Sequence, residues 1–68
     1  MSEEMLYIIE YYYDIKARLW RADVIDEENN VVDYVNAYTE SEIKSETEDL
    51  KQKYPVLRVT KTSFYKYK

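Results

Sequence analysis

The chain has 68 residues, of which 46% are hydrophobic, 14 are acidic and ten are basic, for a formal net charge of −4. A chain this short forms one domain, residues 1–68, and such domains bury only about 60% of the surface of the unfolded chain. Cysteine, histidine and glycine are absent, which excludes disulfides, the usual zinc sites and glycine-rich nucleotide-binding loops.

Three strands are expected in the first half of the chain. The first covers residues 5–13, "MLYIIEYYY", which are rich in β-branched and aromatic residues. A turn at residues 14–17 leads to a second strand over residues 18–26. A turn at residues 27–30, where two asparagines tolerate left-handed backbone, leads to a third strand over residues 31–38.

Alternation along these strands predicts which side chains share a face of the sheet. The first strand has two apolar faces, formed by Tyr7, Ile9, Tyr11 and Tyr13 and by Leu6, Ile8 and Tyr12. The second strand has one apolar face, formed by Trp20, Ala22 and Val24. The third strand divides into Val31, Asp33, Val35 and Ala37 on one face and Val32, Tyr34 and Tyr38 on the other.

A helix is expected over residues 40–53. Thr39 followed by Glu42 is the sequence of a capping box, and Pro55 ends the helix. One apolar stripe recurs at helical spacing, consisting of Ile43, Thr47, Leu50 and Tyr54.

A last strand over residues 56–66, with Leu57 and Val59 facing inward, completes the order β-β-β-α-β. We therefore expect an α+β fold, in which an antiparallel sheet has one helix packed on one face. The opposite face would keep several tyrosines exposed, and exposed patches of this kind often bind partners.

No residue pattern indicates an enzyme, a metal site or a cofactor. The chain lacks a cysteine nucleophile and a histidine base, and its serines have no recognisable catalytic partner. The acidic stretch "DEENN", residues 26–30, lacks the ligand spacing and central glycine of a calcium-binding loop. It is expected to be a solvated turn.

The predicted helix has an acidic ridge, formed by Glu42, Glu46 and Asp49, beside the apolar stripe. Neighbouring carboxylates on such a ridge are about 6 Å apart, which approaches the phosphate spacing of a nucleic-acid strand. The ridge is either a surface that occupies a basic groove or an ordinary solvated helix face. Glu27 and Glu28 add acidic surface elsewhere.

The aromatic residues are the other candidates for partner binding, namely Tyr11, Tyr13, Trp20, Tyr34 and Tyr38. Tyrosine and tryptophan combine a large apolar surface with a polar tip, which suits interfaces. Trp20, between Arg18 and Arg21, fits two roles equally well: an interface hot spot or the single large core residue of a small domain.

Positive charge is concentrated at the C-terminal end. Residues 1–54 contain all 14 acidic and six basic residues, for −8, whereas residues 55–68 contain four basic residues, for +4. Alternation places Arg58, Thr60, Thr62, Phe64 and Lys66 on one face. This strand could bind nucleic acid or be an edge strand protected by charge. The acidic body argues against direct nucleic-acid binding.

The segment "VNAYTESEIKSE" followed by "YPVLRVTK" resembles the strand–helix–strand units of many small phage proteins. With its short, acidic, tyrosine-rich composition, the chain resembles the acidic inhibitors that phages and mobile elements encode, including anti-CRISPR proteins and DNA mimics. The resemblance covers about half of the chain and transfers no binding residue. It implies a non-enzymatic inhibitor that blocks a basic, nucleic-acid-handling host protein, such as a CRISPR effector.

A structural or regulatory homodimer that buries the tyrosines is the remaining alternative, and it is compatible with an inhibitor. No apolar run approaches the roughly 20 residues that span a bilayer, and the N-terminal "MSEEMLYIIE" is acidic where a secretory signal begins basic. We expect no membrane association and a cytoplasmic location, in the host cytoplasm if a phage encodes the chain.

Overall fold

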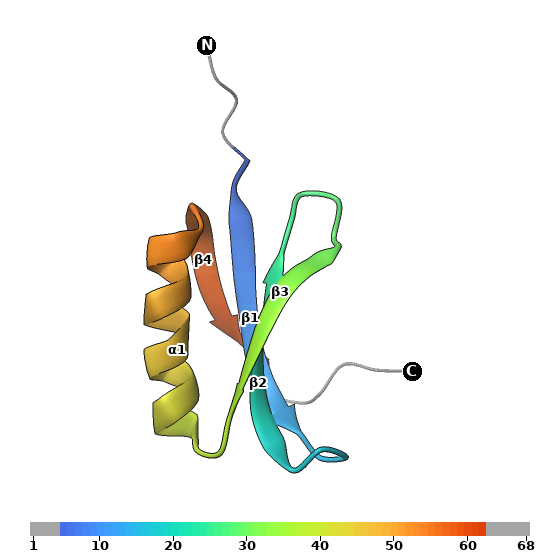
Figure 1. The fold of residues 1–68 in the computed structure, drawn as a ribbon. Helices are drawn as coiled ribbons and strands as arrows, with labels where there is room; N and C mark the ends of the chain where they lie inside the picture. Colours follow the sequence, from blue (N-terminus) through green and yellow to red (C-terminus); the bar gives the residue numbers. More distant parts are fainter. Residues whose placement is uncertain (1–4, 63–68) are drawn as a thin grey trace.

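The computed structural model describes residues 5–62 and contains, in that range, four strands and one helix (Figure 1). The elements are β1 (Tyr7–Asp14), β2 (Leu19–Ile25), β3 (Val31–Ala37), α1 (Glu40–Lys53) and β4 (Val56–Lys61). The predicted α+β class and the order β-β-β-α-β are confirmed. Within residues 5–62, no helix has the length and apolar character needed to cross a bilayer.

The four strands form one mixed sheet in the order β3-β2-β1-β4. β1 pairs with β2, and β2 with β3, in the predicted antiparallel sense, whereas β4 pairs with β1 in parallel. The parallel pair follows from the helix, because α1 returns the chain to the end where β3 began (Figure 1). β4 then runs in the same direction as β3 and β1.

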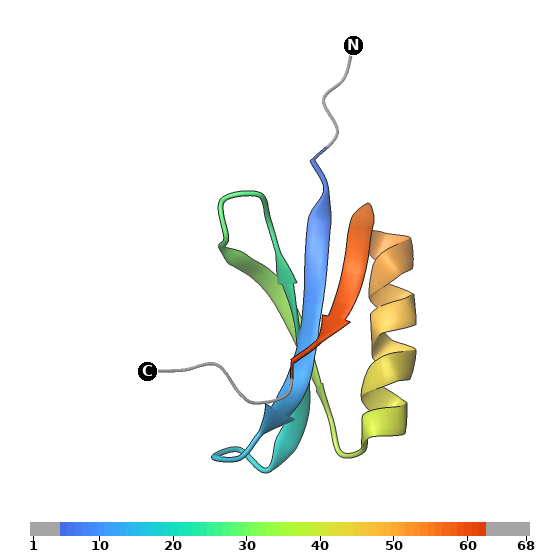
Figure 2. The same ribbon diagram turned by 180° about the vertical axis from the view of Figure 1, so that it is seen from behind.

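Helix α1 covers one face of the sheet, as both views show (Figures 1 and 2). The core between them has three fully buried large side chains, Ile9 of β1, Val24 of β2 and Ile43 of α1. Tyr11, Ala22, Ala37 and Leu50 complete the buried cluster. The face that carries Tyr7, Ile9, Tyr11 and Tyr13 is therefore the helix side. The opposite side is called the outer face below.

Helix α1 has the predicted bounds because its ends are capped. Thr39 Oγ1 accepts a hydrogen bond from the Glu42 N–H at 3.1 Å, and Glu42 Oε1 accepts one from the Tyr38 N–H at 3.2 Å. The carboxylate thus reaches one residue beyond the N-cap itself. At the other end, the Tyr54 N–H donates to Leu50 O at 2.9 Å, and the predicted stripe is buried at Ile43, Thr47 and Leu50.

Aspartate side chains organise both hairpin turns. Asp14 Oδ1 accepts from the Lys16 and Ala17 N–H groups, and the turn continues to Arg18, which adopts φ 60°. The second strand therefore starts one residue later than predicted. In the next turn Asp26 Oδ1 plays the same part, and Asn29 has the expected left-handed backbone at φ 72°.

The inward position predicted for Leu57 is wrong. Tyr7 pairs with Val56 and Ile8 with Arg58, so the register shifts at Leu57. This residue has no partner on β1 and is 57% exposed. β1 begins two residues later than predicted and β4 ends at Lys61; the predicted continuation over residues 63–66 lies outside the described residues.

The cap at Thr39 predicts a measurable contribution to stability. Thr39→Ala removes the acceptor for the Glu42 N–H and should lower the unfolding free energy by about 1 kcal/mol. Thr39→Ser keeps a hydroxyl and should differ little from wild type. Urea unfolding followed by circular dichroism measures both variants, and equal losses for Ala and Ser would contradict the capping role.

Candidate functional site

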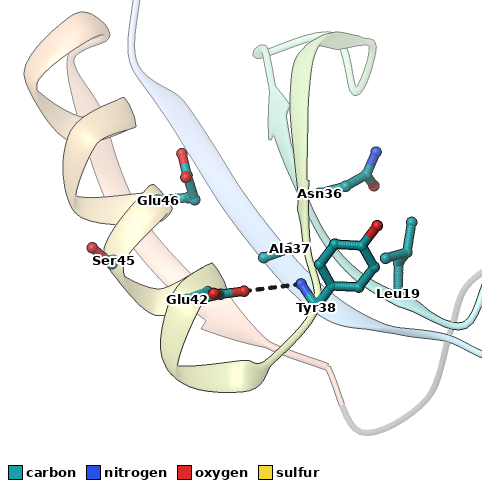
Figure 3. Close-up of a pocket in the computed structure, with 7 residues that line it drawn as sticks. All are labelled: Leu19, Asn36, Ala37, Tyr38, Glu42, Ser45 and Glu46. Atoms are coloured by element: carbon teal, nitrogen blue, oxygen red, sulfur yellow. Dashed lines mark hydrogen bonds between the residues drawn. The ribbon is translucent and has the colours of Figure 1, made fainter.

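A groove of about 390 Å³ separates the end of β3 from the first half of α1 (Figure 3). We call it the β3–α1 groove. It is lined by Leu19, Asn36, Ala37, Tyr38, Glu42, Ser45 and Glu46. Three of the residues predicted to bind a partner, Tyr38, Glu42 and Glu46, are thus brought together.

The helix cap builds this groove. Burial of Ile43 on the sheet fixes the rotation of α1, and Glu42 and Glu46, one turn apart, then project toward the β3 side (Figure 3). The hydrogen bond from the Tyr38 N–H to Glu42 connects the residue after β3 to the first turn of α1. Tyr38 remains 81% exposed beside it.

The groove has the composition of a site for a lysine or arginine side chain. Leu19 and Ala37 supply apolar surface for the methylene stem. Glu42 and Glu46 supply carboxylates for the charged head, and Tyr38 supplies a ring face for a cation–π contact. A neutral or acidic side chain would gain only part of these contacts.

The other predicted acidic residues lie outside the groove. Asp49 continues the ridge on α1, about 4.5 Å further along the helix axis than Glu46. Glu27 and Glu28 are exposed in the β2–β3 turn, at the opposite end of the sheet from the start of α1 (Figure 1). The ridge and the turn are therefore two separate acidic surfaces.

The predicted aromatic residues are also divided among places. Tyr11 is only 8% exposed and belongs to the core. Tyr13 packs edge-on against Trp20, with ring centroids 5.6 Å apart. Trp20 is partly buried against the core, and Lys61 Nζ lies 5.8 Å from its ring centroid. Trp20 therefore packs within the fold and keeps part of its surface exposed.

The outer face has fewer tyrosines than expected. Of the "YYY" run, only Tyr12 is on this face, and Tyr34 of β3 joins it. Tyr34 is 51% exposed, with the Arg21 guanidinium carbon 4.2 Å from its ring centroid. Most of the tyrosine surface of β1 therefore faces the helix.

A buried polar network on the outer face was not predicted. Asp23 accepts a hydrogen bond from the Tyr12 hydroxyl at 3.1 Å and pairs with Arg21 Nε at 2.6 Å. Burial, together with the nearby Asp23 carboxylate, raises the pKa of Tyr12 to about 12. The sequence signal was available, because an aspartate inside an apolar strand needs partners.

A second hollow, of about 380 Å³, lies on the outer face near the β2–β3 turn. Its apolar floor includes Leu6, Ile8, Ile25 and the exposed Leu57. Acidic residues from β1 and the β2–β3 turn border it. The shift in register at Leu57 thus creates part of this hollow.

Asp33 connects β3 to the end of the helix. Its carboxylate accepts from the Tyr54 hydroxyl and from the Tyr34 N–H, both at 2.8 Å, and Lys53 Nζ lies 3.6 Å away. The hydrogen bond from Tyr54, followed by that from Tyr34, lowers the pKa of Asp33 below 3.8. This contact fixes the C-terminal end of α1 over β3.

The basic residues of β4 are partly engaged within the fold. Lys61 Nζ bonds to Glu40 Oε2 at 2.8 Å, whereas Arg58 is exposed next to Ile8. Phe64 and Lys66, which the nucleic-acid alternative also requires, lie outside the described residues. Among residues 5–62, no group of three or more acidic side chains is arranged to hold a metal ion.

No family model, curated protein or solved structure matches the chain.

The outer-face network predicts a pH-dependent effect of Tyr12→Phe. Near neutral pH the variant should be about 1–3 kcal/mol less stable, because a buried carboxylate oxygen loses its donor. The raised pKa of Tyr12 gives wild type an advantage that is complete below pH 10 and is lost as the pH rises toward 12. The stability gap between the two proteins should therefore narrow over this range.

Urea unfolding at several pH values measures this gap. Tyr38→Phe makes the same chemical change at an exposed ring and should leave stability nearly unaltered at each pH. A constant gap for Tyr12→Phe from pH 8 to pH 12 would show that the network does not hold the tyrosine proton.

The Asp33 contact predicts a shifted titration. The carboxyl carbon of Asp33, followed by NMR, should titrate with a midpoint below 3.8. The stabilising contribution of this carboxylate is therefore complete above pH 3.8 and is lost as the pH falls through that lower midpoint. Tyr54→Phe removes the main donor and should raise the midpoint. Tyr7→Phe, which alters the ring packed against Tyr54, should leave it unchanged. A wild-type midpoint at or above 3.8 would rule out the contact.

Proposed function

We propose that this protein is a non-enzymatic binding protein that blocks a basic surface of a nucleic-acid-handling host protein. A CRISPR effector is one protein of that kind. The observation that carries the proposal is the β3–α1 groove, where an exposed tyrosine and two glutamates surround an apolar floor. These groups suit a lysine or arginine that would otherwise contact a phosphate.

The internal use of several other carboxylates supports this role. Asp14 and Asp26 organise turns, Asp23 and Asp33 hold tyrosine hydroxyls, and Glu40 pairs with Lys61. Glu46 and Asp49, by contrast, have no structural role of this kind within residues 5–62. Acidic surface without an internal partner favours association with basic partners and speeds their encounter.

The test compares two variants that remove the same number of charges. Glu42→Gln/Glu46→Gln neutralises the groove, while glutamine can still accept the Tyr38 N–H and preserve the cap. Glu27→Gln/Glu28→Gln neutralises the β2–β3 turn at the other end of the molecule. Both should retain the wild-type circular dichroism spectrum.

Immobilised wild-type protein should capture a basic, nucleic-acid-binding protein from a host lysate, identified by mass spectrometry. When the captured protein is purified and bound to its nucleic acid, addition of the wild-type chain should displace that nucleic acid. The groove variant should bind it at least about tenfold more weakly, whereas the turn variant should bind nearly as well as wild type. Equal binding by all three proteins, or capture without displacement of nucleic acid, would reject the proposal.

A further inference from the structure

Strand β3 forms an edge of the sheet, with no strand on its outer side within residues 5–62. Edge strands expose backbone donors and acceptors, and many are guarded by lysine or proline. The β3 sequence, "VVDYVNA", has neither. Its side chains Val31, Val32 and Tyr34 are exposed. Past the irregular pairing at Val32, this edge has the properties of a template for another strand.

The hydrogen bonds of the neighbouring strands show which β3 backbone groups point outward. Tyr11 O accepts from the Thr62 N–H at 3.0 Å, so the backbone groups of Tyr11 face β4. Alternate residues of a strand bond to opposite sides, so Tyr12 and its partner Arg21 bond to each other. The next residue of β2, Ala22, therefore bonds toward β3.

Ala22 pairs with Val35, so the backbone groups of Val35 face inward and those of Tyr34 and Asn36 face outward. The outward Tyr34 N–H already donates to Asp33 Oδ1 at 2.8 Å. The Tyr34 carbonyl and both backbone groups of Asn36 face the open edge. Asn36 is thus the position where a strand could add without displacing Asp33.

The charge beside this edge indicates what the added strand carries. Asn36 and Ala37 also line the β3–α1 groove, next to Glu42 and Glu46. A second copy of the chain pairing through β3 would bring two such acidic grooves together across the two-fold axis, which like charges oppose. A strand with basic residues on the α1 side would instead neutralise them.

We propose that β3 accepts a strand of the partner protein. The added strand would carry lysine or arginine at alternate positions facing α1, and its other side chains would be apolar and lie on the outer face beside Tyr34. The charge of the partner is taken from the proposed function, and the mode of binding is new. Backbone bonds to Asn36 would supply affinity, and the groove would select the basic side chains.

A synthetic peptide tests this mode directly. The probe is the capped heptapeptide "KVKVKVK", compared with the same peptide carrying backbone N-methyl groups on its three central residues, which keeps the charge but blocks strand pairing. Binding is followed by NMR and by amide hydrogen exchange. The unmethylated peptide should slow exchange of the Asn36 amide, and the methylated peptide should not.

Two variants at one position provide the matched control. Asn36→Pro removes the outward N–H, a substitution that an edge strand tolerates. This variant should bind the peptide about tenfold more weakly. Asn36→Ala keeps the N–H and should bind within about twofold of wild type. Circular dichroism checks that both are folded, and sedimentation of each without peptide reports self-association.

The outcomes separate the two proposals. If Asn36→Pro and the methylated peptide bind as well as their controls, while Glu42→Gln/Glu46→Gln weakens binding, strand addition is wrong and the acidic groove stands. A lack of Asn36 protection at millimolar peptide also overturns strand addition. A wild-type dimer that Asn36→Pro converts to a monomer would assign the edge to a second copy instead.

Discussion

The seating of one short helix on the sheet is the constraint on which the rest of the structure depends. Ile43 and Leu50 are buried in one cluster with Ile9 and Val24, and each fully buried aliphatic side chain contributes about 1.5–3 kcal/mol. Thr47, the polar residue of the buried helix stripe, donates a hydrogen bond from its hydroxyl to Lys44 O at 2.7 Å. Burial of this hydroxyl therefore costs little stability. Because the helix covers only one face, the outer face and the β3 edge remain accessible to partners.

The sequence predicted the elements whose signals are local. Thr39 and Glu42 placed the helix to the residue, and the two turns were found within one residue because aspartate and asparagine act over a few positions. The direction of β4 and the exposure of Leu57 were missed. Both depend on pairing with β1, across most of the chain, where alternation alone leaves direction and register open.

The candidate site was predictable only in part. Helical spacing identified Glu42 and Glu46, and the capping box joined Thr39 to Glu42, whereas the bond from the Tyr38 N–H to Glu42 was not predicted. Tyr11 was proposed for binding as one of the aromatic residues. Both faces of β1 are apolar, and only the position of the helix decides that the face with Tyr11 is buried. The outward groups of Asn36 require the strand order, which no local pattern contains.

The parallel pairing of β4 with β1 also affects how the chain folds during synthesis. Tyr11 and Thr62 are 51 positions apart, whereas β1, β2 and β3 follow one another through short turns. As the chain leaves the ribosome, the two hairpins can form early, while the second edge of β1 waits for β4. During that interval the edge of β1 that contains Tyr7 and Ile9 is unpaired, and pairing of this edge with another nascent chain competes with its correct pairing to β4.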